Sequence, residues 1–177
     1  MKKLGIIFAF MIVAVGTSYA QRVAYVDSEY ILKHIPEYVA AQKKMDDLSM
    51  QWQEEVDAQY AEIEKLYKAY QNDQVLLNDD MRRRREDEIV QKEKEVKDFQ
   101  RKKFGYEGEL FQERIRLVNP IQERVAAAIQ SIAGAQGLDI IMDKKSEVTF
   151  LYANPKLDKS DEVIKKLGFN PDPSLVD

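Results

Sequence analysis

Apolar residues recur every three or four positions along two long segments of the chain, residues 37–76 and 79–135. This spacing places the apolar side chains on one face of an α-helix. The first segment contains neither Gly nor Pro, and its roughly forty residues at about 1.5 Å each would span about 60 Å. The pattern therefore predicts a long helical hairpin, whose turn is supplied by Asn72-Asp73 and Asn78-Asp79-Asp80.

The second helical segment contains two sites that interrupt its pattern. Gly105 and Gly108 weaken its middle, each by about 1 kcal/mol relative to Ala. Asn119-Pro120 predicts a kink or a break, and for a break Asn119 could cap a fresh helix that has Pro120 at its first position and Gln122 closing a capping box. Gly137 is placed to end that helix.

Short runs rich in apolar, β-branched and aromatic residues lie near both ends of the chain, and they predict strands. The sequence then closes with a short helical pattern. We expect strands at residues 22–27, 138–142 and 148–152, and a final helix over residues 159–167 that is capped by Ser160 or Asp161.

The order strand, helical hairpin, strand, strand, helix requires the two ends of the chain to meet. We therefore predict a predominantly helical α+β fold with a small β-rich body and a long helical hairpin inserted between its strands. The expected boundaries are residues 21–36 and 119–167 for the body, 37–118 for the hairpin and 168–177 for a flexible tail.

The predicted body is too small to bury much apolar area by itself. We therefore expect copies of the chain to associate through the strand residues, and this association to supply stability. Because the apolar runs are nearly continuous, alternation does not tell which side chains face a partner copy. The residues assigned to the body core and interface are Val23, Tyr25, Val26, Ile140, Ile141, Val148, Phe150 and Leu151.

The first twenty residues have the layout of a secretory signal peptide. Lys2 and Lys3 precede an uncharged apolar run at residues 4–16, and the small residues Ser18 and Ala20 follow at the −3 and −1 positions of a cleavage site. The run is shorter than the roughly 20 residues that span a bilayer. We predict that residues 1–20 are removed before Gln21, which places the mature chain in the periplasm of a double-membraned bacterium.

The composition narrows the possible chemistry. The chain has no Cys and one His, so it has no disulfide and no thiolate metal site, and a catalytic triad would have to use His34. We expect no metal, no cofactor and no enzymatic activity, and the sequence has no Gly-rich phosphate loop of the G-x-x-x-x-G-K-[ST] type. The basic run Arg82–Arg85 is followed at once by Glu86-Asp87-Glu88, which predicts intrahelical pairs rather than a nucleic-acid site: Arg82–Glu86, Arg84–Asp87 and Arg84–Glu88.

Several segments resemble the Skp/OmpH family of periplasmic chaperones. They are the opening strand Arg22-Val-Ala-Tyr-Val-Asp27, the block 121–143 ending in Gln136-Gly-Leu-Asp-Ile-Ile-Met-Asp143, the run Val148-Thr-Phe-Leu-Tyr152, and the final helix Ser160-Asp-Glu-Val-Ile-Lys-Lys-Leu167. The resemblance implies a homotrimer, in which the β-rich body is the trimerisation domain and three helical tentacles surround a cavity that takes unfolded outer-membrane proteins.

The charge of this chain departs from the strongly basic members of that family. Residues 21–80 carry a net charge of −7 and residues 81–103 a net charge of +4. Attraction to anionic lipid or lipopolysaccharide, which the resemblance associates with basic tentacle tips, is therefore left open for this chain, as is any contact with the membrane surface.

The resemblance implies an ATP-independent holdase that keeps unfolded outer-membrane β-barrels from aggregating. Aromatic side chains on the charged hairpin are the candidates for contact with a client: Tyr60, Tyr67, Tyr70, Phe99, Phe104, Tyr106 and Phe111. The alternative for each aromatic is packing within its own hairpin. The alternative function is a structural coiled-coil protein of the envelope, which the sequence disfavours because its stripe drifts between steps of three and four.

Overall fold

The computed structural model describes residues 21–146 and 151–175, and the chain divides into two compact units. One unit is the central segment Leu32–Val125. The other combines both ends of the chain, Met1–Ile31 and Ala126–Asp177, and contains both strands of the described chain. The predicted signal peptide, residues 1–20, and the strand residues Val148 and Phe150 lie outside the described residues.

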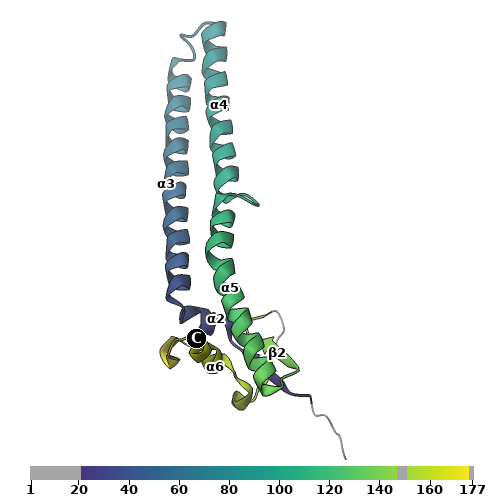
Figure 1. Ribbon diagram of the computed structural model, residues 1–177. Coiled ribbons are helices and arrows are strands. Elements are labelled where there is room, and N and C mark those ends of the chain that lie inside the picture. Colours follow the sequence, from purple (N-terminus) through teal and green to yellow (C-terminus); the bar gives the residue numbers. More distant parts are fainter. Residues whose placement is uncertain (1–20, 147–150, 176–177) are drawn as a thin grey trace, which may run out of the picture. The chain divides into compact units, whose positions relative to one another are not determined.

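The central unit is built from long helices (Figure 1). Helix α3 (Pro36–Asp73) runs without interruption, as its freedom from internal Gly and Pro predicts. Helix α4 (Asp79–Phe104) begins after the Asn78 carboxamide, which accepts a hydrogen bond from the Met81 N–H at 2.9 Å. Helix α5 (Glu109–Gln136) follows and continues into the other unit. The predicted helical hairpin and its turn are confirmed.

The interruption of the second helical segment lies at the glycines and not at Asn119-Pro120, where we had predicted a kink or a break. Pro120 lies inside α5, and buried Val118 and Ile121 flank it on the packed face of the helix. A proline removes one backbone hydrogen bond but does not end a helix whose neighbours remain packed. The chain instead leaves the helical path at Gly105–Gly108.

Two glycines make this break, because neither position has room for a side chain. A Cβ added to Gly105 would lie 2.3 Å from the Arg101 carbonyl oxygen, and one added to Gly108 would lie 2.8 Å from the Gly105 carbonyl oxygen. Between them, Glu107 adopts a left-handed backbone with φ of 61°. The Gly108 carbonyl then accepts the first α5 bond, from the Gln112 N–H at 3.0 Å.

The terminal unit contains a parallel two-stranded sheet formed by strands far apart in sequence. Strand β1 (Val23–Val26) pairs with β2 (Ile140–Asp143) in a register that aligns Val23 with Ile140 and Val26 with Asp143. Parallel strands need a long crossover connection, and here the whole central unit supplies it. On its other side, β1 forms an isolated bridge between Tyr25 and Asp158.

Each strand adjoins the end of a helix. Helix α5 ends at Gln136 and is followed by Gly137 with φ of 61°; the Leu138 N–H donates to the Ala133 carbonyl at 2.9 Å, which confirms the predicted cap. A short helix, α2 (Ser28–Lys33), follows β1. The last α-helix, α6 (Ser160–Lys166), buries Val163 and Ile164.

The cap of α6 differs from the prediction. The N-cap residue is Lys159, which makes no side-chain cap bond, and the carboxylate of the preceding Asp158 accepts hydrogen bonds from the Ser160 N–H at 2.9 Å and the Ser160 hydroxyl at 2.6 Å. Ser160 is buried because its Oγ in turn accepts the Asp27 N–H at 2.8 Å, which ties α6 to the end of β1. Short 3-10 helices precede and follow α6, at Pro155–Leu157 (η1) and Pro173–Leu175 (η2).

The predicted third strand, residues 148–152, is described only in its last two positions. Leu151 and Tyr152 are not in a strand there, and both are exposed. The fold-class prediction itself is confirmed, because the chain is a mainly helical α+β protein with its helical hairpin between the two strands.

Candidate functional site

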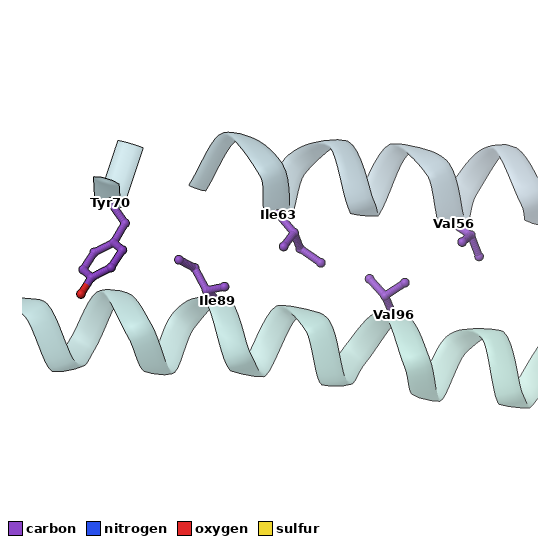
Figure 2. Close-up of a cluster of buried hydrophobic side chains, with 5 residues drawn as sticks. All are labelled: Val56, Ile63, Tyr70, Ile89 and Val96. Atoms are coloured by element: carbon purple, nitrogen blue, oxygen red, sulfur yellow. The ribbon is translucent and has the colours of Figure 1, made fainter. Parts of the chain in front are cut away.

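A narrow apolar seam joins α3 to α4 (Figure 2). Val56, Ile63 and Tyr70 of α3 face Ile89 and Val96 of α4, and all five are at most 9 % exposed. The seam residues are spaced by seven on each helix, which is the spacing of a coiled-coil seam. The sequence reading missed this repeat because it included flanking apolar residues in one drifting stripe. The seam lies within one chain, so it consumes apolar surface that we had considered for client contact.

Polar and aromatic contacts follow the same antiparallel register along the whole central unit. Trp52 meets Phe104 edge to face at 6.1 Å between ring centroids, and the Tyr60 hydroxyl donates to Gln100 at 3.3 Å. Farther from the turn, the Lys44 ammonium lies 3.7 Å from Glu113. The ion pair between Glu37 and Arg124, at 3.1 Å, completes the series. As the residue number on α3 decreases, that of its partner on α4 or α5 increases. The two sides of the helical hairpin therefore contact each other over most of its length.

Three of the seven predicted client-contact residues belong to this packing. Tyr70 is 9 % exposed and its hydroxyl donates a short hydrogen bond to the Glu86 carboxylate, which raises the pKa of Tyr70. Phe99 and Phe104 are half-buried against the seam. For these three, the alternative of packing within the hairpin describes their position in the structure.

The other four aromatics lie on the surface of the hairpin. Tyr60 and Tyr67 of α3 are 39 % and 50 % exposed. Tyr106, in the break between α4 and α5, is 92 % exposed, and Phe111 in the first turn of α5 is 40 % exposed. Tyr106 and Phe111 stack on each other, with 6.1 Å between ring centroids and 25° between ring planes.

Lys103 links the two sides of the break, and its contacts are called the Lys103 clasp below. Lys103 forms a short ion pair with Glu109, the first residue of α5, and this bond lowers the pKa of Glu109. The same ammonium lies 4.6 Å from the centroid of Trp52 and 5.5 Å from that of Phe99. Such cation–π contacts are attractive by about 0.5–2 kcal/mol. Lys103 therefore connects α3, the last turn of α4 and the start of α5.

The hairpin turn combines exposed apolar and basic side chains. Val75 and Leu76 are 92 % and 84 % exposed. The neighbouring arginines form ion pairs within α4, but with partners other than those predicted: Arg82 pairs with Asp79 at 3.9 Å and Arg85 with Glu88 at 3.6 Å. Both pairs step three residues along the helix and both are solvent-exposed, so they contribute little to stability.

The predicted body residues occupy different positions in the terminal unit. Tyr25 and Val26 are buried, and Val23 and Ile141 are half-buried. Ile140, at the start of β2, is 48 % exposed, and Leu151 is 99 % exposed. The structure therefore gives this unit both a buried core and apolar residues that its own chain leaves in solvent.

A polar cluster of the terminal unit is used for holding elements together. The Asp27 carboxylate accepts the Tyr30 N–H at 3.0 Å and lies 3.6 Å from the Lys144 ammonium. The Ser28 N–H donates to Asp143 at 3.1 Å. These bonds join β1, α2 and β2. Within residues 21–146 and 151–175, no group of three His, Cys, Asp or Glu side chains is arranged to hold a metal ion.

None of the helices in the described part of the chain combines the length and the apolar character needed to cross a membrane.

These features define a class of protein: a mainly helical chain in which a long, charged, antiparallel hairpin connects the two strands of a small α+β unit. Residues 22–167 match the sequence model of the family described as "Outer membrane protein (OmpH-like)". Because the match covers most of the chain, the protein belongs to the OmpH-like family, and the resemblance seen in its sequence is confirmed.

The fold is also similar to that of a solved structure. A crystal structure of a candidate outer membrane chaperone (OmpH-like) from Caulobacter crescentus superimposes with a TM-score of 0.64, at 14 % sequence identity, over 85 % of this chain and 86 % of that one. Among curated proteins, none matches the chain.

Proposed function

We propose that this protein is an ATP-independent holdase of the periplasm that binds unfolded outer-membrane β-barrel proteins and keeps them from aggregating. The observation that carries the proposal is the division of the hairpin's aromatics. A five-residue seam holds α3 and α4 together, while Tyr60, Tyr67, Tyr106 and Phe111 stay exposed on the charged hairpin. Membership of the OmpH-like family and the structural similarity support the same function.

The physics of such a client favours weak and scattered contacts. An unfolded outer-membrane strand alternates apolar and polar side chains and has unpaired backbone groups. Exposed aromatics separated by charged residues offer apolar contact without a large contiguous apolar patch. Binding of the unfolded chain competes with its aggregation by mass action, so the holdase needs no nucleotide and no reaction.

The proposal includes a homotrimer that joins through the terminal unit. The outer edge of β2 pairs with no other described strand, since the sheet order is β1-β2 and the isolated bridge lies on β1. A free strand edge offers backbone donors and acceptors to another chain. Exposed Ile140 lies on that strand, and Leu151 and Tyr152 add exposed apolar surface to the same unit. Placement in the periplasm rests on the predicted cleavage before Gln21 and on the family.

The test is the native mass of the purified protein, alone and after a urea-unfolded eight-stranded outer-membrane barrel is diluted into it. We expect a trimer that takes up one barrel chain and keeps it in the supernatant after centrifugation. A protein that leaves the barrel to precipitate at the same rate as buffer alone refutes the holdase. The same result would leave the structural coiled-coil function as the explanation of the hairpin.

A further inference from the structure

We propose that the break between α4 and α5 is a docking platform for one face of an extended client strand, formed by the stacked rings of Tyr106 and Phe111. The inference rests on the proposed function and assigns it a place on the chain and a recognition feature. The ligand class is an extended peptide segment with apolar side chains at every second residue.

The backbone of the break is built to expose an aromatic side chain. Gly105 and Gly108 leave no space for a Cβ, and Glu107 takes the left-handed conformation between them. This path turns Tyr106 outward to 92 % exposure, the same exposure as Val75 in the hairpin turn. In Figure 1 the segment between α4 and α5 leaves the line of the two helices as a short projecting loop. A large aromatic at so exposed a position gains nothing from burial within its own chain.

The two rings are exposed apolar groups at a defined spacing. Their centroids are 6.1 Å apart and their planes differ by 25°. In an extended strand, side chains at positions i and i+2 point to the same face and lie about 6.6 Å apart. The platform therefore matches two successive same-face side chains of a strand. A helical segment presents apolar side chains at a similar spacing, about 5–6 Å between residues three or four apart, so the assignment to an extended segment rests on the unfolded β-barrel client of the proposed function.

The remaining exposed aromatics do not offer such a surface. Tyr60 and Tyr67 lie seven residues apart on α3, which separates them by about 10 Å along the helix. The Tyr60 hydroxyl is also engaged with Gln100. Of the seven aromatic residues assigned to client contact, only Tyr106 and Phe111 are both exposed and stacked on each other.

Ion pairs connect the end of α4 to the start of α5, on the two sides of the platform. Lys103 and Lys102 both pair with Glu109, at the start of α5, and the Lys102 distance is 3.6 Å. The Lys102 side chain is 72 % exposed, and its partner Glu109 precedes Phe111 by two residues. An apolar centre with a charged, hydrated rim is the usual arrangement of a protein interface.

The first test uses site-specific photo-crosslinking on the purified full protein. The photoreactive residue p-benzoylphenylalanine replaces Tyr106 in one variant and Val75 in a matched control, since both positions are 92 % exposed and lie in loops. The probes are a ten-residue peptide of alternating Leu and Thr and a peptide of the same composition with its Leu residues in one block. We expect the alternating peptide to crosslink at least about threefold more at position 106 than at 75, because the ring of Phe111 beside position 106 adds apolar surface for its Leu side chains. We also expect position 106 to prefer it over the block peptide.

Equal yields at the two positions, or equal yields with the two peptides, overturn the inference. Crosslinks at position 106 that join two copies of the chain, and not chain to peptide, also overturn it, because they make the rings a self-association surface. Failure of the platform can be told apart from failure of the proposed holdase function. If the protein keeps an unfolded barrel soluble while position 106 shows no preference, the platform fails and the holdase stands.

A second measurement uses affinity. The double variant Tyr106→Ser/Phe111→Gln should bind the alternating peptide about five- to tenfold more weakly by fluorescence anisotropy, because it removes the apolar surface of both rings. The double variant Val75→Ser/Val90→Ser is the matched control, because both side chains are exposed on the hairpin and lie outside the platform, and its affinity should change less than twofold. Emission from Trp52, the chain's single tryptophan, verifies that each variant is folded. Equal losses in the two variants contradict the platform.

Discussion

Val90 and Val96 lie on the same helix and carry the same side chain, yet Val90 is 63 % exposed and Val96 is 1 % exposed in the seam. The substitution Val96→Ala should destabilise the protein by about 1–3 kcal/mol, because it removes buried methyl groups and leaves a cavity between α3 and α4. Val90→Ala should change the free energy of unfolding by less than about 0.5 kcal/mol. Urea denaturation followed by circular dichroism measures both, and equal effects would contradict the seam.

The Lys103 clasp predicts a pH response that a single fluorophore reports. Because the bond to Lys103 lowers the pKa of Glu109, the stabilisation is present above the ordinary Glu value of about 4.3 and is lost as pH falls through the lower folded pKa. Since Lys103 also lies over Trp52, acid should shift tryptophan emission below about pH 4.3.

The control variants for this response lie close together in sequence. Glu109→Gln should remove the emission shift in that pH range, because no carboxylate remains at the clasp to be protonated. Glu107→Gln, in the same loop, should keep the shift. If Glu109→Gln titrates like the unchanged protein, the clasp is not the source of the response.

Single residues also show where sequence reasoning reached its limit. Tyr70 and Tyr67 are both tyrosines on one helical stripe, but Tyr70 is buried and bonded to Glu86, while Tyr67 is half in solvent. Helical spacing predicts only that a residue lies on a broad apolar stripe of the helix, about 100° wide. Whether a residue lies in the seam or beside it depends on the partner helix, whose register no local pattern contains. The choice among the seven aromatics therefore required the structure.

At the scale of elements, the glycines of the chain have opposite roles. Gly105 ends α4 where a Cβ would strike the Arg101 carbonyl oxygen, whereas Gly134 lies inside α5 with nothing within 4 Å of the Cβ position. Gly105→Ala should therefore destabilise the protein, and Gly134→Ala should stabilise it by about 0.5–1 kcal/mol through helix propensity and a less free unfolded chain. Thermal unfolding distinguishes the two. Stabilisation by Gly105→Ala would show that the break is not required by the fold.

The elements that were predicted well and badly differ in a physical respect. The long helices α3 and α4, the strands β1 and β2, and the Gly137 cap follow from local patterns and local backbone preferences. The break was misplaced at Pro120 because proline is locally unfavourable in a helix, while packing of Val118 and Ile121 holds α5 together across it. Tertiary packing overrides local preference at that position.

At the scale of the whole molecule, the family and the fold class were accessible from the sequence because they rest on segments at both chain ends, which the family match over residues 22–167 includes.

The charge of the hairpin is uneven, net −7 over residues 21–80 and +4 over 81–103. Among the described residues, ion pairs between α3 and α4 do not neutralise it, since the pairs of α4 lie within that helix or reach Glu109. Client binding through charge should therefore weaken as salt rises, because exposed charges are screened over about 8–10 Å.

Association of the proposed trimer gives the last prediction. If copies join at the edge of β2 that pairs with no other strand among the described residues, a charge on that edge opposes the contact, because burying an unpaired ammonium is unfavourable. Ile140→Lys should therefore raise the dissociation constant at least about tenfold, which corresponds to about 1.4 kcal/mol. Val75→Lys, which adds the same charge in the hairpin turn, should leave it unchanged. Sedimentation velocity over a range of concentrations measures both variants, with circular dichroism as the check that the helices persist. A fully associated Ile140→Lys variant would place the contact between copies elsewhere on the chain, whereas a folded monomer would place it at this strand.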